Sequence, residues 1–117
     1  MTLEKLISLV KEEKPNTFSE SKLTEYVNDI EAEVAEQFLT DAPIYDWEED
    51  QEALLLAPRP YDKLYVSYVK AKIDYANEEY ESYTNNATQH AQDFKELVDW
   101  IVRENQAPGI TRFRNIF

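Results

Sequence analysis

The densest group of side chains that could do chemistry is a run of carboxylates near the middle of the chain: Asp46, Glu48, Glu49, Asp50 and Glu52. Clustered carboxylates are the ligands that hard cations such as Mg²⁺ or Ca²⁺ require. The run lacks the alternating aspartates and turn glycine of an EF-hand loop, and no hydroxyl or lysine partner nearby indicates a metal nuclease. Three interpretations remain for these five acids: a solvated charged loop, a metal site, or a surface that repels other negative charges.

Histidine and tyrosine are the other candidates for chemistry. His90 is the only histidine, and no metal ligand or nucleophile stands at helical spacing from it, so we expect a helix residue at the edge of the core. Six of the eight tyrosines fall between residues 61 and 83. Activating a tyrosine nucleophile needs clustered cations, and only three lysines are near. We expect packing instead, with hydroxyls at the wet rim of a helix bundle or a subunit interface. No catalytic or cofactor-binding motif is present, so the sequence predicts neither an enzyme nor a cofactor.

The last eleven residues, 107–117, differ from the rest of the chain. They hold two arginines and no acid, whereas residues 1–106 hold all 24 acids and ten of the 12 basic residues, which gives −14 for the body and +2 for the tail. Arginine and phenylalanine are enriched in protein interfaces. We therefore expect an extended docking tail that binds a partner, with a frayed terminus as the alternative. Its partner-binding residues would be Ile110, Arg112, Phe113, Arg114, Ile116 and Phe117.

Length and charge restrict the function further. With 117 residues, the chain should form one small domain, here 1–106, followed by the tail. A net charge of −12 disfavours sequence-specific binding of nucleic acid, because phosphates would be repelled. The chain has no cysteine, and no apolar run reaches the roughly 20 residues needed to cross a bilayer. We expect a soluble protein of the cytosol without a membrane partner.

The apolar pattern predicts an all-α fold, a small bundle of about four helices. A single glycine, Gly109, disfavours tight hairpins, and apolar residues recur at three- and four-residue steps. The expected helices span about 2–14, 19–40, 60–83 and 86–105, with Thr17 in capping-box spacing to Glu20 and a break at Thr84-Asn85-Asn86. Residues 41–59 should form a long irregular connector in which Leu54-Leu55-Leu56 is a short strand or a plug over the core.

Three stretches and a final pattern stand out within about residues 53–105: Ala57-Pro58-Arg59-Pro60-Tyr61-Asp62-Lys63-Leu64-Tyr65, Ala71-Lys72-Ile73-Asp74-Tyr75-Ala76-Asn77-Glu78-Glu79-Tyr80, Tyr83-Thr84-Asn85-Asn86, and Phe94, Trp100 and Arg103. In these residues the chain resembles a group of small tailed-phage and prophage proteins. The group belongs to the head–tail connector proteins, also called head-completion or adaptor proteins. The segment 110–117 is not part of the pattern.

The resemblance implies a structural virion protein. Such connectors are helical bundles that assemble as a ring, usually of twelve copies, below the portal, in the neck of the virion. The partners implied are further copies of the chain, the portal protein and a tail-side neck or stopper protein, with host cytoplasm as the place of assembly. DNA would pass through the ring without specific binding, consistent with acids at 46–52 on a loop or channel wall. The alternative is a small acidic inhibitor or DNA mimic that binds a host nucleic-acid-binding protein.

Overall fold

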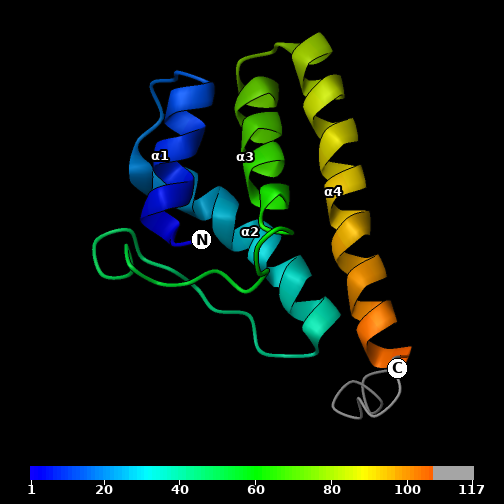
Figure 1. Cartoon of the computed structure of the whole chain (residues 1–117). Coiled ribbons are helices and arrows are strands. Elements are labelled where there is room, and N and C mark those ends of the chain that lie inside the picture. The colour runs from blue at the N-terminus through cyan, green and yellow to red at the C-terminus, as the bar shows by residue number, and fades with distance from the viewer. Residues whose placement is uncertain (107–117) are drawn as a thin grey trace.

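The computed structural model describes residues 1–106, which form four helices (Figure 1): α1 (Leu3–Glu13), α2 (Glu20–Phe38), α3 (Lys63–Ala76) and α4 (Tyr80–Gln106). Helices α3 and α4 form a hairpin and lie side by side, with α1 beside α3 and α2 crossing behind them. The predicted all-α bundle is confirmed. No helix of the described part is long and apolar enough to cross a membrane.

The first two helices follow the predicted pattern closely. The hydroxyl of Thr2 accepts the backbone N–H of Lys5 and begins α1. The cap of α2 is Ser19, whose side chain accepts the N–H of Lys22, so the prediction of Thr17 in this role is wrong. Leu39 ends α2 in a left-handed conformation, with φ at 50°.

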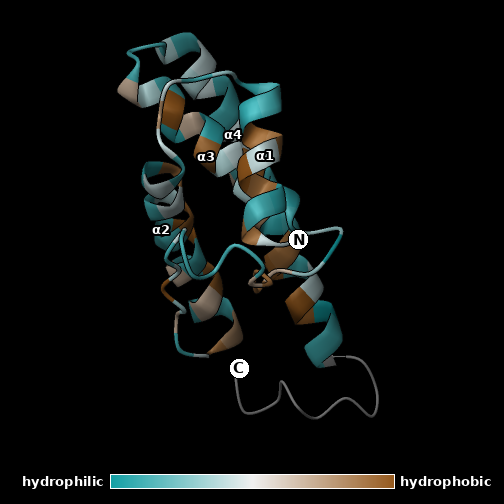
Figure 2. Cartoon of the chain, turned by 90° about the vertical axis from the view of Figure 1, so that its left-hand side faces the viewer, coloured by the Kyte–Doolittle hydropathy of each residue, from teal (hydrophilic) through white to brown (hydrophobic). Residues whose placement is uncertain are grey.

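One buried face of each helix builds the core, and Figure 2 shows hydrophobic residues recurring among hydrophilic ones along the helices. Apolar residues at helical spacing place these faces inward, and burying each large side chain contributes about 1.5–3 kcal/mol. The predicted stripe of α3 is confirmed at its centre, where Ile73 is fully buried. The fully buried apolar side chains include Leu3, Leu6, Val10, Leu23, Val27, Ile30, Val34, Leu64, Tyr65, Val69, Ile73 and Leu97.

The irregular connector between α2 and α3 crosses one end of the bundle and is fixed to the start of α1. Leu55 donates its N–H to Met1 O at 3.0 Å, and Leu3 donates to Ala53 O at 3.0 Å. Leu55 is buried while Leu54 is 72% exposed, as expected for adjacent residues in extended backbone. The prediction of an irregular connector is therefore confirmed. Of the three leucines at 54–56, only Leu55 has a buried side chain.

A buried carboxylate joins this connector to α2 and α3. Glu31 is fully buried on α2 and accepts the hydroxyls of Tyr45 at 2.6 Å and Tyr65 at 2.5 Å, and the N–H of Leu56 at 2.9 Å. Burial, together with the charge of Glu31, raises the pKa of both tyrosines. The two hydroxyls therefore stay protonated and continue to donate to Glu31.

The junction of α3 and α4 differs from the prediction. The third helix ends at Ala76 rather than near 83, and α4 begins at Tyr80 and continues through Thr84-Asn85-Asn86 without a break. Thr84 donates its hydroxyl to Tyr80 O inside the helix, and Asn86 donates to a carboxylate on α3, so neither disrupts the backbone ladder. The turn instead uses Glu78, which has φ at 60°.

The start of α3 also differs from the prediction. The helix begins at Lys63 with Asp62 preceding it, whereas the sequence predicted a start at Pro60. Tyr61 donates its N–H to Pro58 O at 2.8 Å, which makes a turn of the residues just before the helix.

Candidate functional site

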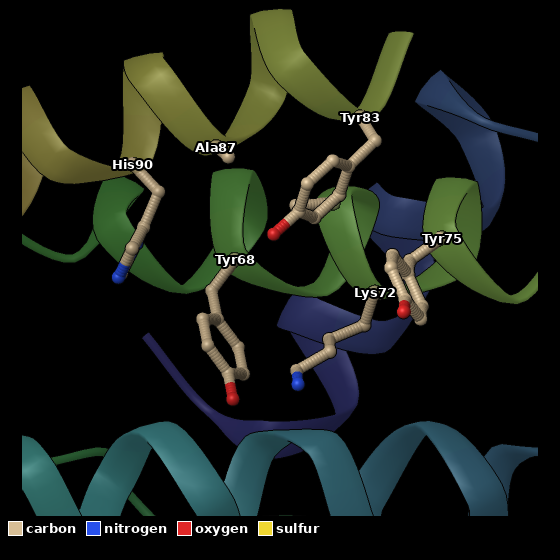
Figure 3. Close-up of a pocket in the computed structure, with 7 residues that line it drawn as sticks. Tyr68, Lys72, Tyr75, Tyr83, Ala87 and His90 are labelled. Carbon is tan, nitrogen blue, oxygen red and sulfur yellow. The ribbon is translucent and has the colours of Figure 1, made fainter. Parts of the chain in front are cut away.

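A concave site of the described chain is a groove over α3, between α4 on one side and α2 on the other. We call it the tyrosine groove, and it is lined by Ala71 and by the residues labelled in Figure 3: Tyr68, Lys72, Tyr75, Tyr83, Ala87 and His90. Its volume is about 380 Å³, near the lower end for sites that hold small ligands or side chains. Tyr68, Lys72 and Tyr75 project from α3, and the other three come from α4.

Tyr75 and Tyr83 line the end of the groove near the α3–α4 turn, and Tyr80 lies beside them. Tyr75 contacts Tyr83 edge to face at a ring-centroid separation of 5.3 Å, and Tyr80 at 6.0 Å. Tyr75 and Tyr80 remain 60% and 56% exposed. Such contacts orient the rings while leaving apolar area uncovered. The prediction that these side chains pack at a wet rim is confirmed, although Tyr65 is fully buried instead.

The other end of the groove is formed by Tyr68, Lys72 and His90. Lys72 Nζ lies 5.4 Å from the centre of the Tyr68 ring, and the rings of Tyr68 and His90 are 5.1 Å apart. Burial raises the pKa of Tyr68 to about 12, with Asp29 and Glu33 of α2 as the next causes. The hydroxyl is thus a neutral group, and Figure 3 shows it pointing toward α2, the helix that carries Asp29 and Glu33.

His90 is a half-buried residue of α4, as predicted. Its Nδ1 lies 2.9 Å from Leu64 O, so the neutral ring donates this proton to the carbonyl. Burial lowers the pKa of His90, which keeps the ring uncharged at neutral pH. The groove therefore offers aromatic faces and one ammonium group, which are groups that could contact a bound side chain.

The five acids of the predicted cluster lie on the connector. Asp46, Glu48, Glu49 and Glu52 are exposed and Asp50 is half-buried. Two of them shape the loop itself, because Glu48 N donates to Asp46 Oδ1 at 2.9 Å and Asp46 N donates to Asp50 Oδ2 at 2.8 Å. Among residues 1–106, no group of three acidic or histidine side chains is arranged to hold a metal ion.

The predicted partner-binding residues of the tail, Ile110, Arg112, Phe113, Arg114, Ile116 and Phe117, lie outside the described residues. The structure does not test that prediction.

The residues that resemble the phage proteins lie mainly in the α3–α4 hairpin and in the segment just before α3. Asp74 is fully buried on α3, pairs with Lys14, and accepts Ser82 at 2.9 Å and Asn86 at 2.6 Å. Burial alone would raise the pKa of Asp74, but the bonds from Lys14, Asn86 and Ser82 outweigh it and hold the pKa below its usual range. Because these bonds tie α1 and α4 to α3, the motif residues fix how the helices pack.

A second part of the same pattern joins the other end of the hairpin. The ring of Tyr61 stacks on Trp100 at 5.1 Å, and Arg103 donates to the Tyr61 hydroxyl at 3.3 Å. The pattern thus spans both ends of α4, and it includes packing residues at each end as well as exposed ones such as Tyr75 and Tyr80.

Glu31, Asp29 and Glu33 were missed in the sequence. Glu31 occupies a helical step of four from Val27 and three from Val34, so it stands in the apolar stripe of α2, and that position was the available signal. No such signal exists for Asp29 and Glu33, whose relation to the tyrosine groove depends on how α2 crosses α3.

Comparison of the chain with protein-family models, with curated proteins and with solved structures found no match.

Proposed function

We propose that this protein is a structural head–tail connector of a tailed phage or prophage, which binds the portal and assembles there as a ring, usually of twelve copies. The observation that carries the proposal is the packing role of the resembling residues. Asp74, Asn86, Tyr61 and Trp100 all hold the α3–α4 hairpin together. These four residues act in packing, and no reactive group of the resembling stretches is arranged for catalysis in the part of the chain that the structure describes, which fits a structural role.

The distribution of charge supports the same function. The net charge is −12, and four of the five clustered acids are exposed on the irregular segment between α2 and α3. A channel wall that carries such charge would repel DNA phosphates and let the duplex pass without adhesion. The tail-side partner would be a neck or stopper protein.

The exposed acidic loop also fits the second candidate, a DNA mimic that occupies the nucleic-acid site of a host protein. A mimic needs carboxylates that match phosphate positions, and it needs no portal. The two functions therefore predict different binding partners.

The test is to mix the purified chain with the portal protein encoded by the same genome and to measure the mass of the product by mass photometry. The connector function predicts one discrete complex, in which a fixed number of copies joins each portal ring. Failure to bind the portal, with binding to a host nucleic-acid-binding protein in its place, supports the mimic. The portal ring alone is the control for mass.

A further inference from the structure

The tyrosine groove exposes more aromatic surface than a solvated rim requires. Tyr75 is 60% exposed beside Tyr83, and Tyr80 at the same end is 56% exposed. Exposed, mutually oriented aromatic rings are typical of protein-binding surfaces, where such rings become buried anchors.

The charge around the groove selects a basic occupant. Asp29 and Glu33 lie one turn apart on the exposed face of α2 and act on the hydroxyl of Tyr68. Lys72 is the cation among the residues that line the groove, and His90 is neutral, whereas the neighbouring helix α2 (Figure 3) carries the two exposed carboxylates Asp29 and Glu33. An arginine next to an apolar side chain could pair with a carboxylate while its neighbour covers a tyrosine ring.

One segment of this chain has that chemistry. Residues 110–117 alternate arginine with apolar side chains, at Arg112, Phe113 and Arg114, and hold no acid. We propose that the tyrosine groove binds residues 110–117 of a second copy of this chain, with the arginines at Asp29 and Glu33 and the phenylalanines against Tyr68, Tyr75 and Tyr83.

Reach along the helix favours a second copy over the same chain. At 1.5 Å per residue, His90 lies about 24 Å and Tyr83 about 34 Å from the end of α4 at Gln106. If the chain reverses at Pro108-Gly109, residues 110–117 span at most about 29 Å when fully extended. Only the last residues could then reach the part of their own groove between His90 and Tyr83.

A tail in a neighbour's groove is a head-to-tail contact, which closes into a ring or continues as a filament. The inference rests on the proposed function, since it names the contact between adjacent copies of the connector.

The first experiment measures binding of a fluorescent synthetic peptide of residues 107–117 to the full-length chain carrying Arg112→Glu and Arg114→Glu, so that the groove is free. We expect saturable binding. Ala87→Trp should fill the groove and weaken binding at least tenfold. Ala91→Trp makes the same change one turn further along α4, at an exposed residue outside the groove, and should leave binding unchanged. Absence of binding, or equal effects of the two tryptophans, overturns the proposal.

A charge reversal tests the assigned pairs. Asp29→Arg with Glu33→Arg should weaken binding of the native peptide at least tenfold and restore binding of a peptide that carries Arg112→Glu and Arg114→Glu. A merely structural role of Asp29 and Glu33 would not produce this rescue, and its absence refutes the pairing.

Sedimentation of the native chain decides between a second copy and the same chain. A second copy predicts oligomers whose mass rises with concentration, and Ala87→Trp, or Arg112→Glu with Arg114→Glu, should reduce them to monomers. A mixture of these two variants can make one contact and should form a dimer. A native chain that stays monomeric at concentrations where the peptide saturates the free groove would assign the groove to the tail of its own chain and overturn the proposal.

These outcomes are separable from the proposed function. If Ala87→Trp chains join the portal complex normally, the groove inference fails while the connector function stands. If native chains do not bind the portal, the function fails whatever the peptide does.

Discussion

Replacing Glu31 by glutamine should destabilise the fold strongly, because this one side chain satisfies three buried donors. Tyr45 and Leu56 donate to Oε2 at 2.6 and 2.9 Å, and Tyr65 donates to Oε1 at 2.5 Å. A glutamine oxygen can keep the first two donors, but its NH₂ group then faces the Tyr65 hydroxyl, which already accepts the N–H of Ala57 at 2.8 Å.

The size of the effect follows from these bonds. A hydrogen bond to a charged group contributes about 1.5–3 kcal/mol, and a neutral one about 0.5–1.5 kcal/mol. Losing one charged bond and weakening two others should lower the free energy of unfolding by about 3 kcal/mol. For a domain of this size, that corresponds to a fall in Tm of about 10 °C.

Urea denaturation followed by circular dichroism measures this change. The matched control is Glu36→Gln, at an exposed position on the same helix, which should change stability by at most about 0.5 kcal/mol. In a double-mutant cycle, Glu31→Gln and Tyr65→Phe should be strongly non-additive, since both remove the same bond. A loss below about 0.5 kcal/mol for Glu31→Gln, or simple additivity in the cycle, would refute the buried network.

Four further predictions concern folding, charge, pH and the tail. Ile73→Asp should prevent folding by burying an unpaired charge, and an unchanged melting temperature would contradict the assigned core. Changing the five clustered acids at residues 46–52 to amides should leave the melting temperature nearly unchanged, because four are exposed, yet make packaging or ejection of DNA more sensitive to low salt; loss of a metal-dependent activity would contradict this. Stability should fall as the pH drops below 6.5, since the folded pKa of His90 lies below that unfolded value, and this loss should vanish in His90→Phe. It should also fall above pH 10, because the folded state raises the pKa of Tyr68 from 10.0 to about 12 and raises those of Tyr45 and Tyr65 as well; a flat profile on either side would contradict the respective shifts. Deleting residues 109–117 should leave the melting temperature nearly unchanged while preventing incorporation into the neck, and a truncated chain that unfolds or still joins the particle would exclude the docking role.

The helices were predictable because their apolar spacing, which local sequence shows, is also what places their buried faces in the core. The stripes of α1 and α2 mark their buried faces, and Ile73 lies at the centre of the stripe of α3. The α3–α4 junction was misplaced because Asn86 bonds Asp74 across the hairpin, a long-range contact that local rules do not contain.

The candidate site was only partly predictable. Tyrosines at the solvent-exposed edge of the bundle could be expected, because the chain has many of them and each combines an apolar ring with a polar hydroxyl. The groove could not be predicted, because it depends on how α2 crosses α3, and that crossing brings α2 with Asp29 and Glu33 near Tyr68, about forty residues later in the chain. The residue pattern of a single helix does not contain this information.

The most direct test of the connector function is a cryo-EM reconstruction of the native chain bound to the portal protein of the same genome. The proposed function predicts a closed ring of copies on the portal, with the acids at residues 46–52 facing the DNA channel. The groove inference adds that residues 110–117 of each copy lie in the tyrosine groove of the next. A chain that leaves the portal bare, or that binds it as separate copies without mutual contact, would contradict the function proposed here.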